Sequence, residues 1–483
     1  MVTPYQTGDR LPPDVFRWIR RRAIFEYCKW DPQVGDVEVL ADFPLYLDPA
    51  AWQTIRTAAG RMAREVLAAE EEIGRSPALL RRLNLPRPIR RILEQRMHHA
   101  PPPGVARLIR FDFHYTPDGW KISEANTDVP GGFVEASGFA RLVQEHCPGT
   151  TLCGDPTAAL ADALAAGGRT GDVVALVHAT AYSDDRQVME HIGKALTERG
   201  RVAVPVAPDL VRWNGTSAWV DTATGPARVG RIVRFYPAEW MINLPRRSQW
   251  PHFFGHPSIP MCNPGTVLVT QTKRFPLVWD SLSNSMETWR SYLPEVRPFD
   301  RRLGGSPDWV IKPAYGRVGE GVGIAGVTEE KEWRRIQRAA RRNPEDWILQ
   351  RRFRVDSVPS PAGEVYVCIG VYTVDGCPAG AYGRIARKPL TDSEAKDIAV
   401  LMKCETAPCD FESGRMKNRK VYEQQMSLLQ NPDGRRGRRP SHRGDRRLLM
   451  NREGPRPRGP FAGGVLQEPQ MSTDVVEEES RKT

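Results

Sequence analysis

Residues 105–126 read VARLIRFDFHYTPDGWKISEAN, and the fold is inferred outward from this stretch. Two runs rich in apolar residues flank the sequence TPDG at 116–119. Proline presets the backbone for a turn and glycine adopts conformations that other residues avoid, so TPDG indicates a tight turn. The stretch therefore predicts a β-hairpin with one strand on either side of this turn.

Polar side chains recur on both predicted strands of the hairpin. Successive side chains of a strand point to opposite faces, so residues two apart share a face. If the pairing is symmetric about Asp118, Asp112 lies opposite Glu124 at a distance of roughly 5 Å. Arg110 then lies opposite Asn126 on the same face.

This grouping of oxygen atoms is typical of a magnesium site. Mg²⁺ binds through one or two carboxylates and completes its coordination with water and substrate phosphates. Facing carboxylates repel each other unless a cation lies between them. Asp112, Glu124 and Asn126 are therefore candidate metal ligands, and the alternative is a solvated hairpin face.

A second segment, WVIKPAYGRVGEGVGI, covers residues 309–324. It reads as a short apolar strand that ends at Lys312 and continues into a loop. The loop glycines are Gly316, Gly319, Gly321 and Gly323. Glycine lets the backbone approach a ligand and leaves amide groups free for phosphate oxygens, while Lys312 and Arg317 supply positive charge. The segment is not a Walker sequence, and the alternative is a flexible glycine hairpin.

Two further segments complete a series. VLVTQTKRFPLVW at 267–279 holds Lys273, and WILQRRF at 347–353 holds Gln350. The predicted order is a strand with Lys273, a strand with Lys312 and its glycine loop, and then a strand with Gln350. This is the order in which the nucleotide cleft of an ATP-grasp fold is built.

The chain resembles the glutathionylspermidine synthase type of ATP-grasp ligase, which includes the synthetase half of trypanothione synthetase. The matching pieces follow the family's order over most of residues 20–402: RFDFHYTPDGWKISEANTDVP, RFYPAEWM, TQTKRFPLVW, WVIKPAYGR, ILQRRF and AGAYGRIARKPLT. The D-x₁₁-E-x-N spacing combined with a K-P-x-x-G-R loop is specific. In this family the metal-binding strands precede the nucleotide lysines, a permuted order relative to other ATP-grasp enzymes.

The resemblance implies a role for each matching residue. The implied ligands of Mg²⁺ are Asp112, Glu124 and Asn126. The implied nucleotide-binding residues are Lys273, Lys312, Gly316, Gly319, Gly321 and Gln350. The implied catalytic residues, beside the transferred phosphoryl and acyl groups, are Arg110, Arg317 and Arg384. The chain departs from the family after Asn126, where TDVPGG replaces a turn that commonly begins with a small hydroxylic residue, so the substrate carboxylate pocket is less well matched.

The middle of the chain predicts a β-α-β unit. DVVALVHA at 172–179 and RVAVPVA at 201–207 read as strands, with a helix over 185–199 between them. Further helices are predicted at 49–72 and 87–97. A second hairpin is predicted around Asp375-Gly376, and its second strand carries Arg384.

These elements and the resemblance together imply an α/β (α+β) class, an ATP-grasp fold with a Rossmann-like pre-ATP-grasp subdomain. The catalytic region would cover 1–402, with the Rossmann-like part at about 150–260 and a nucleotide-binding lobe at about 265–402. After residue 402 Pro, Gly, Arg and Ser dominate, so 403–483 is predicted to be a disordered tail.

The net charge of +11 is concentrated in this tail. Residues 435–458 contain ten arginines against Asp445 and Glu453, and the rest of the chain is nearly neutral. Such a segment could bind nucleic acid through phosphates, but no aromatic residues are interleaved for stacking. A solvated tail is therefore expected, and nucleic acid is not an expected partner outside it.

Other features point to a cytoplasmic location. There is no apolar run long enough to span a membrane and no secretory leader pattern. The eight cysteines are scattered without a C-x-x-C pair, which indicates neither a disulfide framework nor a zinc site. The nine histidines are dispersed, and His114 is interpreted as a surface or packing residue.

The resemblance, together with the predicted metal and nucleotide residues, implies an ATP-dependent carboxylate–amine ligase that forms an amide through an acyl phosphate, with ATP and Mg²⁺ as cofactors. Its partners would be a small carboxylic acid and an amine, and at family level glutathione and a polyamine. A polyamine requires an acidic pocket, for which Glu135 and Glu239 are candidates, although either could form a structural salt bridge. Replacing Asp112 or Glu124 by alanine is expected to abolish ligation and leave the fold intact.

Two other interpretations stay open at this point. The first is an ATP-grasp ligase of another substrate class, such as a peptide or natural-product tailoring enzyme. The second is a non-enzymatic interaction protein that acts through its arginine-rich tail on nucleic acid or a membrane surface.

Overall fold

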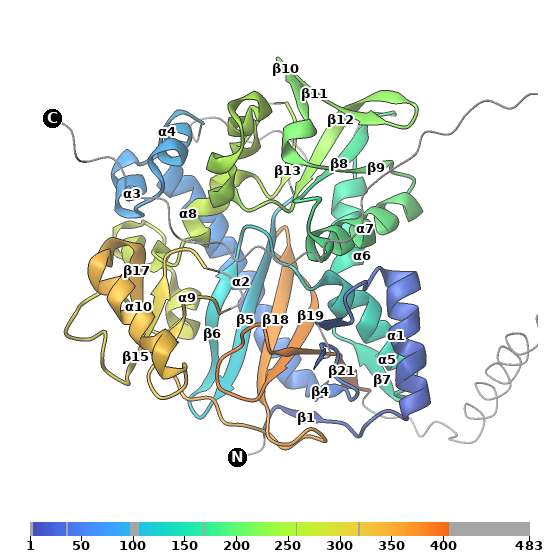
Figure 1. Ribbon diagram of the computed structural model, residues 1–483, viewed down its shortest axis with the longest axis vertical. Helices are drawn as coiled ribbons and strands as arrows, with labels where there is room; N and C mark the ends of the chain where they lie inside the picture. Colours follow the sequence, from blue (N-terminus) through green and yellow to red (C-terminus); the bar gives the residue numbers. More distant parts are fainter. Residues whose placement is uncertain are drawn as a thin grey trace, which may run out of the picture. The chain divides into compact units, whose positions relative to one another are not determined.

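The computed structural model describes residues 3–34, 37–96, 106–167, 169, 171–256, 258–316 and 319–404. These residues form a mixed α/β fold with four larger sheets and one two-stranded ribbon (Figure 1). The predicted tail lies outside the described residues from residue 405 onward. The proposed boundary at 402 therefore stays a prediction.

A five-stranded antiparallel sheet carries the residues of the first predicted hairpin. Its order is β20-β19-β18-β5-β6. The strands are β5 (Leu108–Thr116), β6 (Gly119–Asn126), β18 (Tyr366–Val374), β19 (Cys377–Ala386) and β20 (Lys396–Ile398). The turn between β18 and β19 has positive φ at Asp375 (51°) and Gly376 (77°), as a two-residue hairpin turn requires. Both predicted hairpins are confirmed.

One face of this sheet is buried against the long helix α2 (Pro49–Gly74), which passes behind it in Figure 1. Phe111, Phe113 and Ile369 point to this side and are fully buried. The side chain of Asp48 caps the N-terminus of α2 by accepting hydrogen bonds from the backbone N–H groups of Ala50 and Ala51. Because side chains alternate along a strand, the opposite face is left for polar residues.

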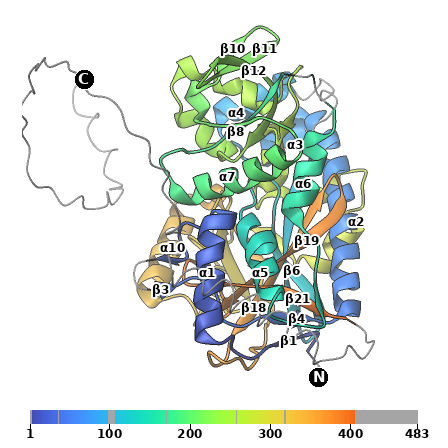
Figure 2. The same cartoon turned by 90° about the vertical axis from the view of Figure 1, so that its right-hand side faces the viewer.

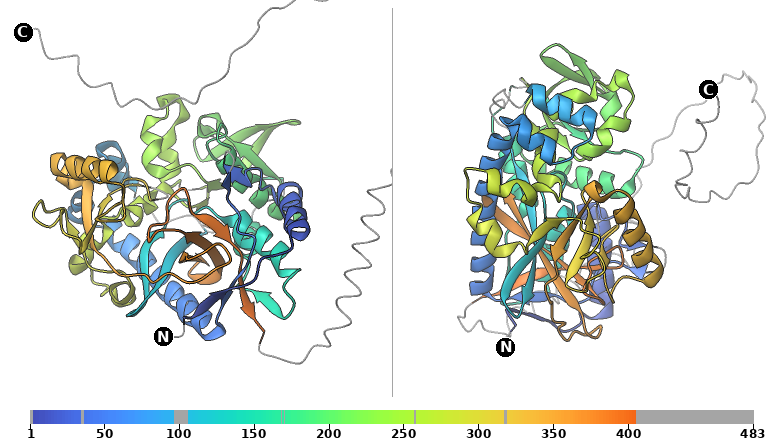
Figure 3. Two further views of the ribbon diagram at one scale, coloured as in Figure 1. Left: turned by 60° about the horizontal axis from the view of Figure 1, so that its bottom comes forward. Right: turned by 90° about the vertical axis from the view of Figure 1, so that its left-hand side faces the viewer.

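A four-stranded antiparallel sheet carries the glycine-loop segment. Its order is β14-β17-β15-β16. The strands are β14 (Val296–Pro298), β15 (Trp309–Pro313), β16 (Gly323–Ile324) and β17 (Trp347–Arg351). Helix α10 (Glu330–Arg342) packs on β15 and β16 through a separate small core that includes Ile311 and Ile336 (Figure 3). The predicted strands that hold Lys312 and Gln350 are confirmed.

A six-stranded sheet contains the predicted β-α-β unit. Its order is β10-β11-β12-β8-β9, and β13 pairs with β12. The strands are β8 (Val173–Val177), β9 (Ala203–Val206), β10 (Arg212–Asn214), β11 (Ser217–Thr222), β12 (Gly225–Arg234) and β13 (Met261–Cys262). β8 pairs with β9 in parallel, as predicted. Helices α6 (Pro156–Ala165) and α7 (Ser183–Glu198) lie side by side against this sheet (Figure 2).

The fourth larger sheet joins distant parts of the chain. Its order is β1-β4-β21-β7. The strands are β1 (Tyr5–Thr7), β4 (Leu45–Leu47), β7 (Thr150–Leu152) and β21 (Val400–Lys403). Helices α1 (Pro13–Tyr27) and α5 (Ala140–Gln144) share a core with it. The ribbon is β2 (Gln33–Val34) with β3 (Val37–Glu38). Strand β21 lies between β4 and β7, a pairing that no local pattern predicts.

Three further helices lie along the chain between strands of different sheets. They are α3 (Pro77–Arg82), α4 (Arg87–Arg96) and α9 (Glu287–Tyr292). The helices predicted at 49–72 and 87–97 are thus confirmed as α2 and α4. Within the described residues, no helix combines the length and apolar character that crossing a membrane requires. The seven described cysteines are free thiols.

The predicted strand around Lys273 is wrong. Residues 267–279 form the short helix α8 (Leu268–Gln271) and part of a 3₁₀ helix (Phe275–Ser281). Leu268 and Val269 are fully buried, and α8 packs against α2. A short apolar run is compatible with a buried strand or a buried helical turn, and here the tertiary packing selects the helical form.

Candidate active site

The β5–β6 hairpin has the predicted pairing where its polar residues lie. Asp112 pairs with Glu124, and Arg110 pairs with Asn126. Nearer the turn the pairing is one residue out of step, because Phe113 pairs with Ile122. The turn is therefore shorter than pairing symmetric about Asp118 assumes. One extra residue in β6 compensates, so Asp112 still pairs with Glu124 as predicted.

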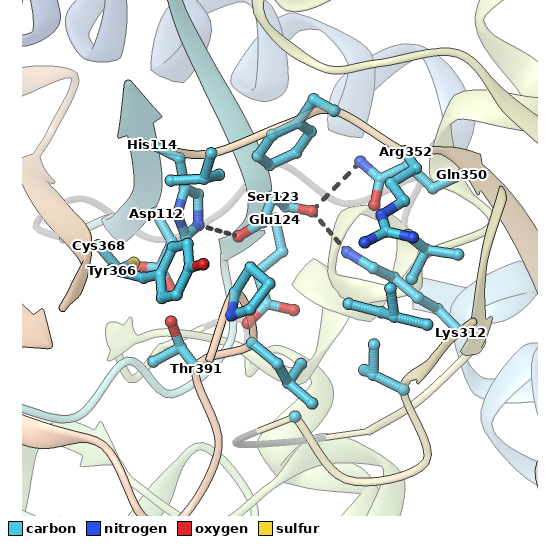
Figure 4. Close-up of a pocket in the computed structure, with 18 of the residues that line it drawn as sticks. Asp112, His114, Ser123, Glu124, Lys312, Gln350, Arg352, Tyr366, Cys368 and Thr391 are labelled. Carbon is cyan, nitrogen blue, oxygen red and sulfur yellow. Dashed lines mark hydrogen bonds between the residues drawn. The ribbon is translucent and has the colours of Figure 1, made fainter. Parts of the chain in front are cut away.

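That extra residue is Ser123, which forms a β-bulge. Its backbone carbonyl accepts hydrogen bonds from Nζ of Lys312 at 3.0 Å and from Nε2 of Gln350 at 3.4 Å. Its hydroxyl lies 3.0 Å from Nε2 of His114. These three contacts are drawn in Figure 4. The bulge therefore connects the hairpin to the four-stranded sheet, because bulged residues leave the regular ladder.

Asp112 is the most deeply buried carboxylate of this group, at 1% exposure. Arg110 donates from Nε to Oδ1 at 2.7 Å and from Nη2 to Oδ2 at 3.1 Å. Nη2 of Arg384 and Nδ2 of Asn126 also donate to Oδ2, at 2.9 Å and 3.4 Å. Burial would raise the pKa of Asp112, but the two guanidinium groups outweigh burial and lower it. Asp112 is therefore a fixed anion.

The two arginines beside Asp112 have different surroundings. Arg110 also donates from Nη1 to the carbonyl of Gly131 at 2.8 Å, and its guanidinium lies against the rings of Tyr372 and Tyr382. It is not among the described residues that line the cavity below, whereas Arg384 is. The buried Nε of Arg384 has no hydrogen-bond partner within the described residues. Arg384 is thus the arginine available to a ligand, and Arg110 positions Asp112.

Lys273 links the hairpin to the glycine loop. Its Nζ lies 3.4 Å from Oε2 of Glu124 and donates to the carbonyl of Gly316 at 3.0 Å. Burial would raise the pKa of Glu124, but the charge of Lys273 outweighs it and the pKa is lowered. Although the strand prediction failed, Lys273 therefore lies between Glu124 and the loop at Gly316.

Lys312 and Gln350 lie on neighbouring strands of the four-stranded sheet, at 7% and 3% exposure. Burial lowers the pKa of Lys312 to about 8, against the opposing effect of Glu124. At neutral pH a lysine with this pKa is still mostly an ammonium ion, and an approaching anion would raise its pKa and keep it charged. Lys312 is therefore suited to bind a phosphate oxygen.

A cavity of about 560 Å³ lies between the two sheets (Figure 4). This volume is within the range of small-molecule sites. The five-stranded sheet contributes Asp112, His114, Ser123, Glu124, Cys368 and Arg384. The four-stranded sheet and its loops contribute Val310, Lys312, Gly316, Gly319, Val322, Ile324 and Gln350. The described lining thus brings together the predicted residues Asp112, Glu124, Lys273, Lys312, Gly316, Gly319, Gln350 and Arg384. Asn126 and Arg110 are not among the described lining residues.

The predicted loop residues differ in what the structure describes of them. Gly321 is not among the described lining residues, and Arg317 lies outside the described residues. Gly319 has φ of 72°, and a Cβ there would lie 2.8 Å from the carbonyl oxygen of Thr391. The glycine at 319 is therefore required by backbone packing, whether or not its amide meets a phosphate.

The candidate ligands of Mg²⁺ form a small donor set. Within the described residues, no group of three or more His, Cys, Asp and Glu side chains could hold a metal ion. Asp112, Glu124 and Asn126 supply two carboxylates and one amide, so phosphate oxygens and water would have to complete the coordination. This composition fits a Mg²⁺ ion that binds together with a nucleotide.

His114 lines the cavity and its ring packs 5.5 Å from that of Phe353, which agrees with the interpretation as a packing residue and adds its place at the site. Burial lowers its pKa to about 4, and the ring is neutral near physiological pH. The signal was available in the sequence, since His114 lies two residues beyond Asp112 on the same strand and shares its face.

Glu135 and Glu239 are not among the described residues that line the cavity. Glu135 lies on a π-helix (Val134–Phe139) and forms an ion pair with Nζ of Lys29 at 2.6 Å. Glu239 lies on a 3₁₀ helix (Ala238–Asn243). The structure therefore separates both residues from the cavity that holds the other predicted site residues.

Comparison with solved structures gives likenesses in fold. The chain is similar to a glutathione synthetase-like effector from Globodera pallida in its apo form, with a TM-score of 0.56 and 12% identity over 81% of this chain and 97% of that one. It also matches a protein described as a γ-glutamylcysteine synthetase from Methylobacillus flagellatus, with a TM-score of 0.40 and 15% identity over 74% of this chain and 96% of that one. No curated protein sequence matches significantly.

A family comparison covers most of the catalytic region inferred from the sequence. The family described as glutathionylspermidine synthase preATP-grasp matches residues 26–402. The match includes the β5–β6 hairpin, Lys273, Lys312, Gln350 and Arg384. With more than half of its length matched, the chain belongs to the glutathionylspermidine synthase preATP-grasp family.

Proposed function

We propose that this chain is an ATP-dependent ligase that joins a carboxylic acid to an amine through an acyl phosphate, in a cleft of the ATP-grasp type. Family membership supports this class of reaction. The observation that carries the proposal is the cavity between two sheets, with Asp112 and Glu124 on one side and Lys312 and Gln350 on the other. Acidic metal ligands facing buried phosphate-binding lysines are what phosphoryl transfer from a nucleotide requires.

The nucleotide would lie between the two sheets. Gln350 and the apolar side chains of Val310 and Ile324 would contact the base. Lys312 and Lys273 would bind phosphate oxygens, and the nearby amide groups of the loop at Gly316 would add hydrogen bonds. The triphosphate end would then lie beside Asp112 and Glu124.

Mg²⁺ would be held by Asp112, Glu124 and Asn126, and when bound it supplies neutralisation of the phosphate charge. An oxygen of the acid attacks the terminal phosphorus, and ADP leaves. The amine then attacks the carbonyl carbon of the acyl phosphate, and phosphate leaves with the formation of the amide. Arg384, whose Nε is unpartnered within the described residues, would stabilise the oxyanion of the acyl centre.

The test is ADP release from ATP and Mg²⁺ with panels of carboxylic acids and amines. We expect release only when both an acid and an amine are present, and the amide product by mass spectrometry. Glu124→Gln keeps the shape of the side chain and removes its charge, so it should reduce the rate by about 10²–10³. Release that needs neither substrate, or a near wild-type rate for Glu124→Gln, contradicts the proposal.

The matched control is Glu330→Gln, on the surface of α10 and away from the cavity. It removes the same charge from the protein. It should leave the rate unchanged, so a loss shared by both variants would indicate a general effect of charge.

A further inference from the structure

Two guanidinium groups share a single carboxylate on the polar face of the five-stranded sheet. Asp112 accepts two hydrogen bonds from Arg110, at 2.7 Å and 3.1 Å, and one from Nη2 of Arg384 at 2.9 Å. One negative charge lies between two positive ones, and the two arginines repel each other. An additional contact that favours cations would stabilise both groups in this arrangement.

Arg384 is anchored through one of its nitrogen atoms. Nη2 donates to Asp112 and also lies 3.9 Å from Sγ of Cys368. Nε has no hydrogen-bond partner within the described residues. Contacts at a single nitrogen leave the plane of a guanidinium group free to turn. The direction in which Nε points therefore depends on what packs against the face of the group.

The ring of Tyr382 lies against both guanidinium groups. Its centroid is 5.3 Å from Cζ of Arg110 and 5.5 Å from Cζ of Arg384. At such distances the electron-rich face of an aromatic ring attracts a cation. Tyr372 also contacts Arg110, at 5.9 Å, but among the described residues Tyr382 is the ring that contacts both arginines. It therefore supplies the additional contact.

The register of the sheet explains how Tyr382 meets the arginines. Gly370 of β18 pairs with Asp112 of β5 on one side and with Tyr382 of β19 on the other. A Cβ at Gly370 would lie 2.7 Å from Cδ of Arg110 and 3.1 Å from Oδ1 of Asp112. The missing side chain leaves a gap between Asp112 and Tyr382, and the side chain of Arg110 lies across it.

The ring of Tyr382 is itself fixed from two sides. Its hydroxyl donates to Oδ1 of Asp397 at 2.5 Å. A Cβ at Gly132 would lie 2.9 Å from Cε1 of the ring, so the loop after β6 packs directly on it. Tyr382 is only 9% exposed and is not among the described residues that line the cavity. Any effect of this ring on the reaction is therefore carried by the arginines that it contacts.

We propose that Tyr382 is a positioning residue for the acyl-transfer step, because the face of its ring sets the plane of the Arg384 guanidinium and so the direction of Nε. This inference rests on the proposed ligase function, in which Arg384 stabilises the oxyanion of the acyl centre. It adds a residue that lies outside the predicted metal, nucleotide and arginine residues.

The first experiment changes the electron density of the ring and keeps its shape. ADP release is measured with an acid and an amine that the panel has shown to support it. Tyr382→Phe removes the hydroxyl and keeps the ring face, so kcat should stay within about threefold of the wild type. Trifluorophenylalanine at position 382 has the same ring, but its fluorine atoms withdraw electron density from the face. It should lower kcat by about tenfold, with KM for ATP unchanged.

A double-mutant cycle tests whether the ring acts through Arg384. Tyr382→Leu should lower kcat by about tenfold in the wild type. In a protein that already carries Arg384→Met, the same change should cost less than about twofold, because the contact has already been removed. Effects that a purely structural role produces would instead multiply.

The matched control is Tyr46→Leu in β4. Its ring lies 5.1 Å from Nζ of Lys403, so this variant also removes a contact between a tyrosine and a cation. Tyr46 belongs to another sheet and is not among the described lining residues of the cavity. Both kcat and KM should therefore stay at the wild-type values.

Three outcomes would overturn the inference and leave the ligase proposal standing. They are a loss for Tyr382→Phe as large as that for trifluorophenylalanine, a full loss from Tyr382→Leu beside Arg384→Met, and a rise in KM for ATP without a fall in kcat. The thermal transition of each variant checks its folding, and if Tyr382→Leu does not fold, the ring series still decides. If the wild type releases no ADP with any acid and amine, the ligase proposal fails and this inference fails with it.

Discussion

The two sheets that border the cavity hold their charged groups in different ways. In the five-stranded sheet, Asp112 receives hydrogen bonds from Arg110, Arg384 and Asn126, all on strands of the same sheet. In the four-stranded sheet, Lys312 and Gln350 reach across the cavity to the carbonyl of Ser123. The charged groups of the five-stranded sheet therefore hold one another in place without a ligand. Those of the four-stranded sheet are held by contacts that a ligand could replace.

This difference indicates where binding energy is used. A preorganised wall stabilises developing charge without reorganisation, which favours the chemical step. In the four-stranded sheet, burial disfavours the charged form of Lys312, so an anion that binds there stabilises this lysine in particular. Changes to the five-stranded sheet should accordingly affect stability and turnover, and changes to the four-stranded sheet should affect nucleotide affinity.

The largest effect is expected for Asp112→Asn. It leaves Arg110 and Arg384 buried without their anion, so the free energy of unfolding should fall by about 3–5 kcal/mol. Turnover should fall as well, and urea denaturation and ADP release measure the two effects. The burial of Asp112 thus replaces the expectation from the sequence that its removal leaves the fold intact. Asp308→Asn, at an exposed lining residue, should cost little stability, and equal losses in both variants would contradict the comparison.

Next in size is the contrast between the two arginines. Arg384→Lys should lower kcat by about 10², because a preorganised donor at the acyl centre is displaced. Arg110→Lys should instead lower the free energy of unfolding by about 1–3 kcal/mol, because buried hydrogen bonds to Asp112 and Gly131 are lost. Stopped-assay kinetics and urea denaturation of both variants distinguish these effects. The reverse pattern would show that Arg110 is the catalytic group.

Deletion of Ser123 removes the bulge that joins the two sheets. Glu124 would then follow Ile122 directly and still pair with Asp112, but Lys312 and Gln350 would lose the carbonyl of Ser123 as their acceptor. Affinity for an ATP analogue in the presence of Mg²⁺ should fall by about 10–100-fold, as measured by calorimetry. Ser123→Gly keeps the backbone carbonyl and should bind nearly as the wild type does. A larger loss for Ser123→Gly than for the deletion would refute the role of the bulge.

The smallest effect concerns pH and Lys312. Its pKa is about 8 in the free protein, below the usual 10.5, so the group becomes neutral above about pH 8. Nucleotide binding must then take up a proton, and affinity should fall by about tenfold per pH unit above that point. The effect of pH on folding has the opposite sign. Between about pH 8 and the usual lysine pKa of 10.5, the unfolded chain binds more protons than the folded protein does, so the free energy of unfolding rises with pH. Lys312→Arg should flatten the affinity profile, and a slope that persists would assign the titration to another group.

Local features could be predicted from the sequence. The pairing of Asp112 with Glu124 was correct, although it was inferred from a symmetric turn that does not exist. The shorter turn and the extra residue Ser123 cancel, so the register at the polar positions is the same. Strand alternation also predicts that His114 shares their face, a consequence the sequence interpretation did not draw.

Long-range features could not be predicted in this way. The conformation around Lys273 depends on packing against α2, and the pairing of β21 depends on strands hundreds of residues away. The ion pair of Lys29 with Glu135 joins residues far apart in the chain, so Glu135 looked available when it was considered alone. Charge pairing of this kind requires the tertiary structure.

The bulge also separates two kinds of change in this hairpin. A residue gained or lost in the turn alters the turn and leaves the strand pairs beyond it in place, so Asp112 still faces Glu124. A one-residue slip of β6 along β5 would instead move Glu124 and Asn126 to the other face together. The carbonyl of Ser123, held by Lys312 and Gln350 of the neighbouring sheet, opposes such a slip.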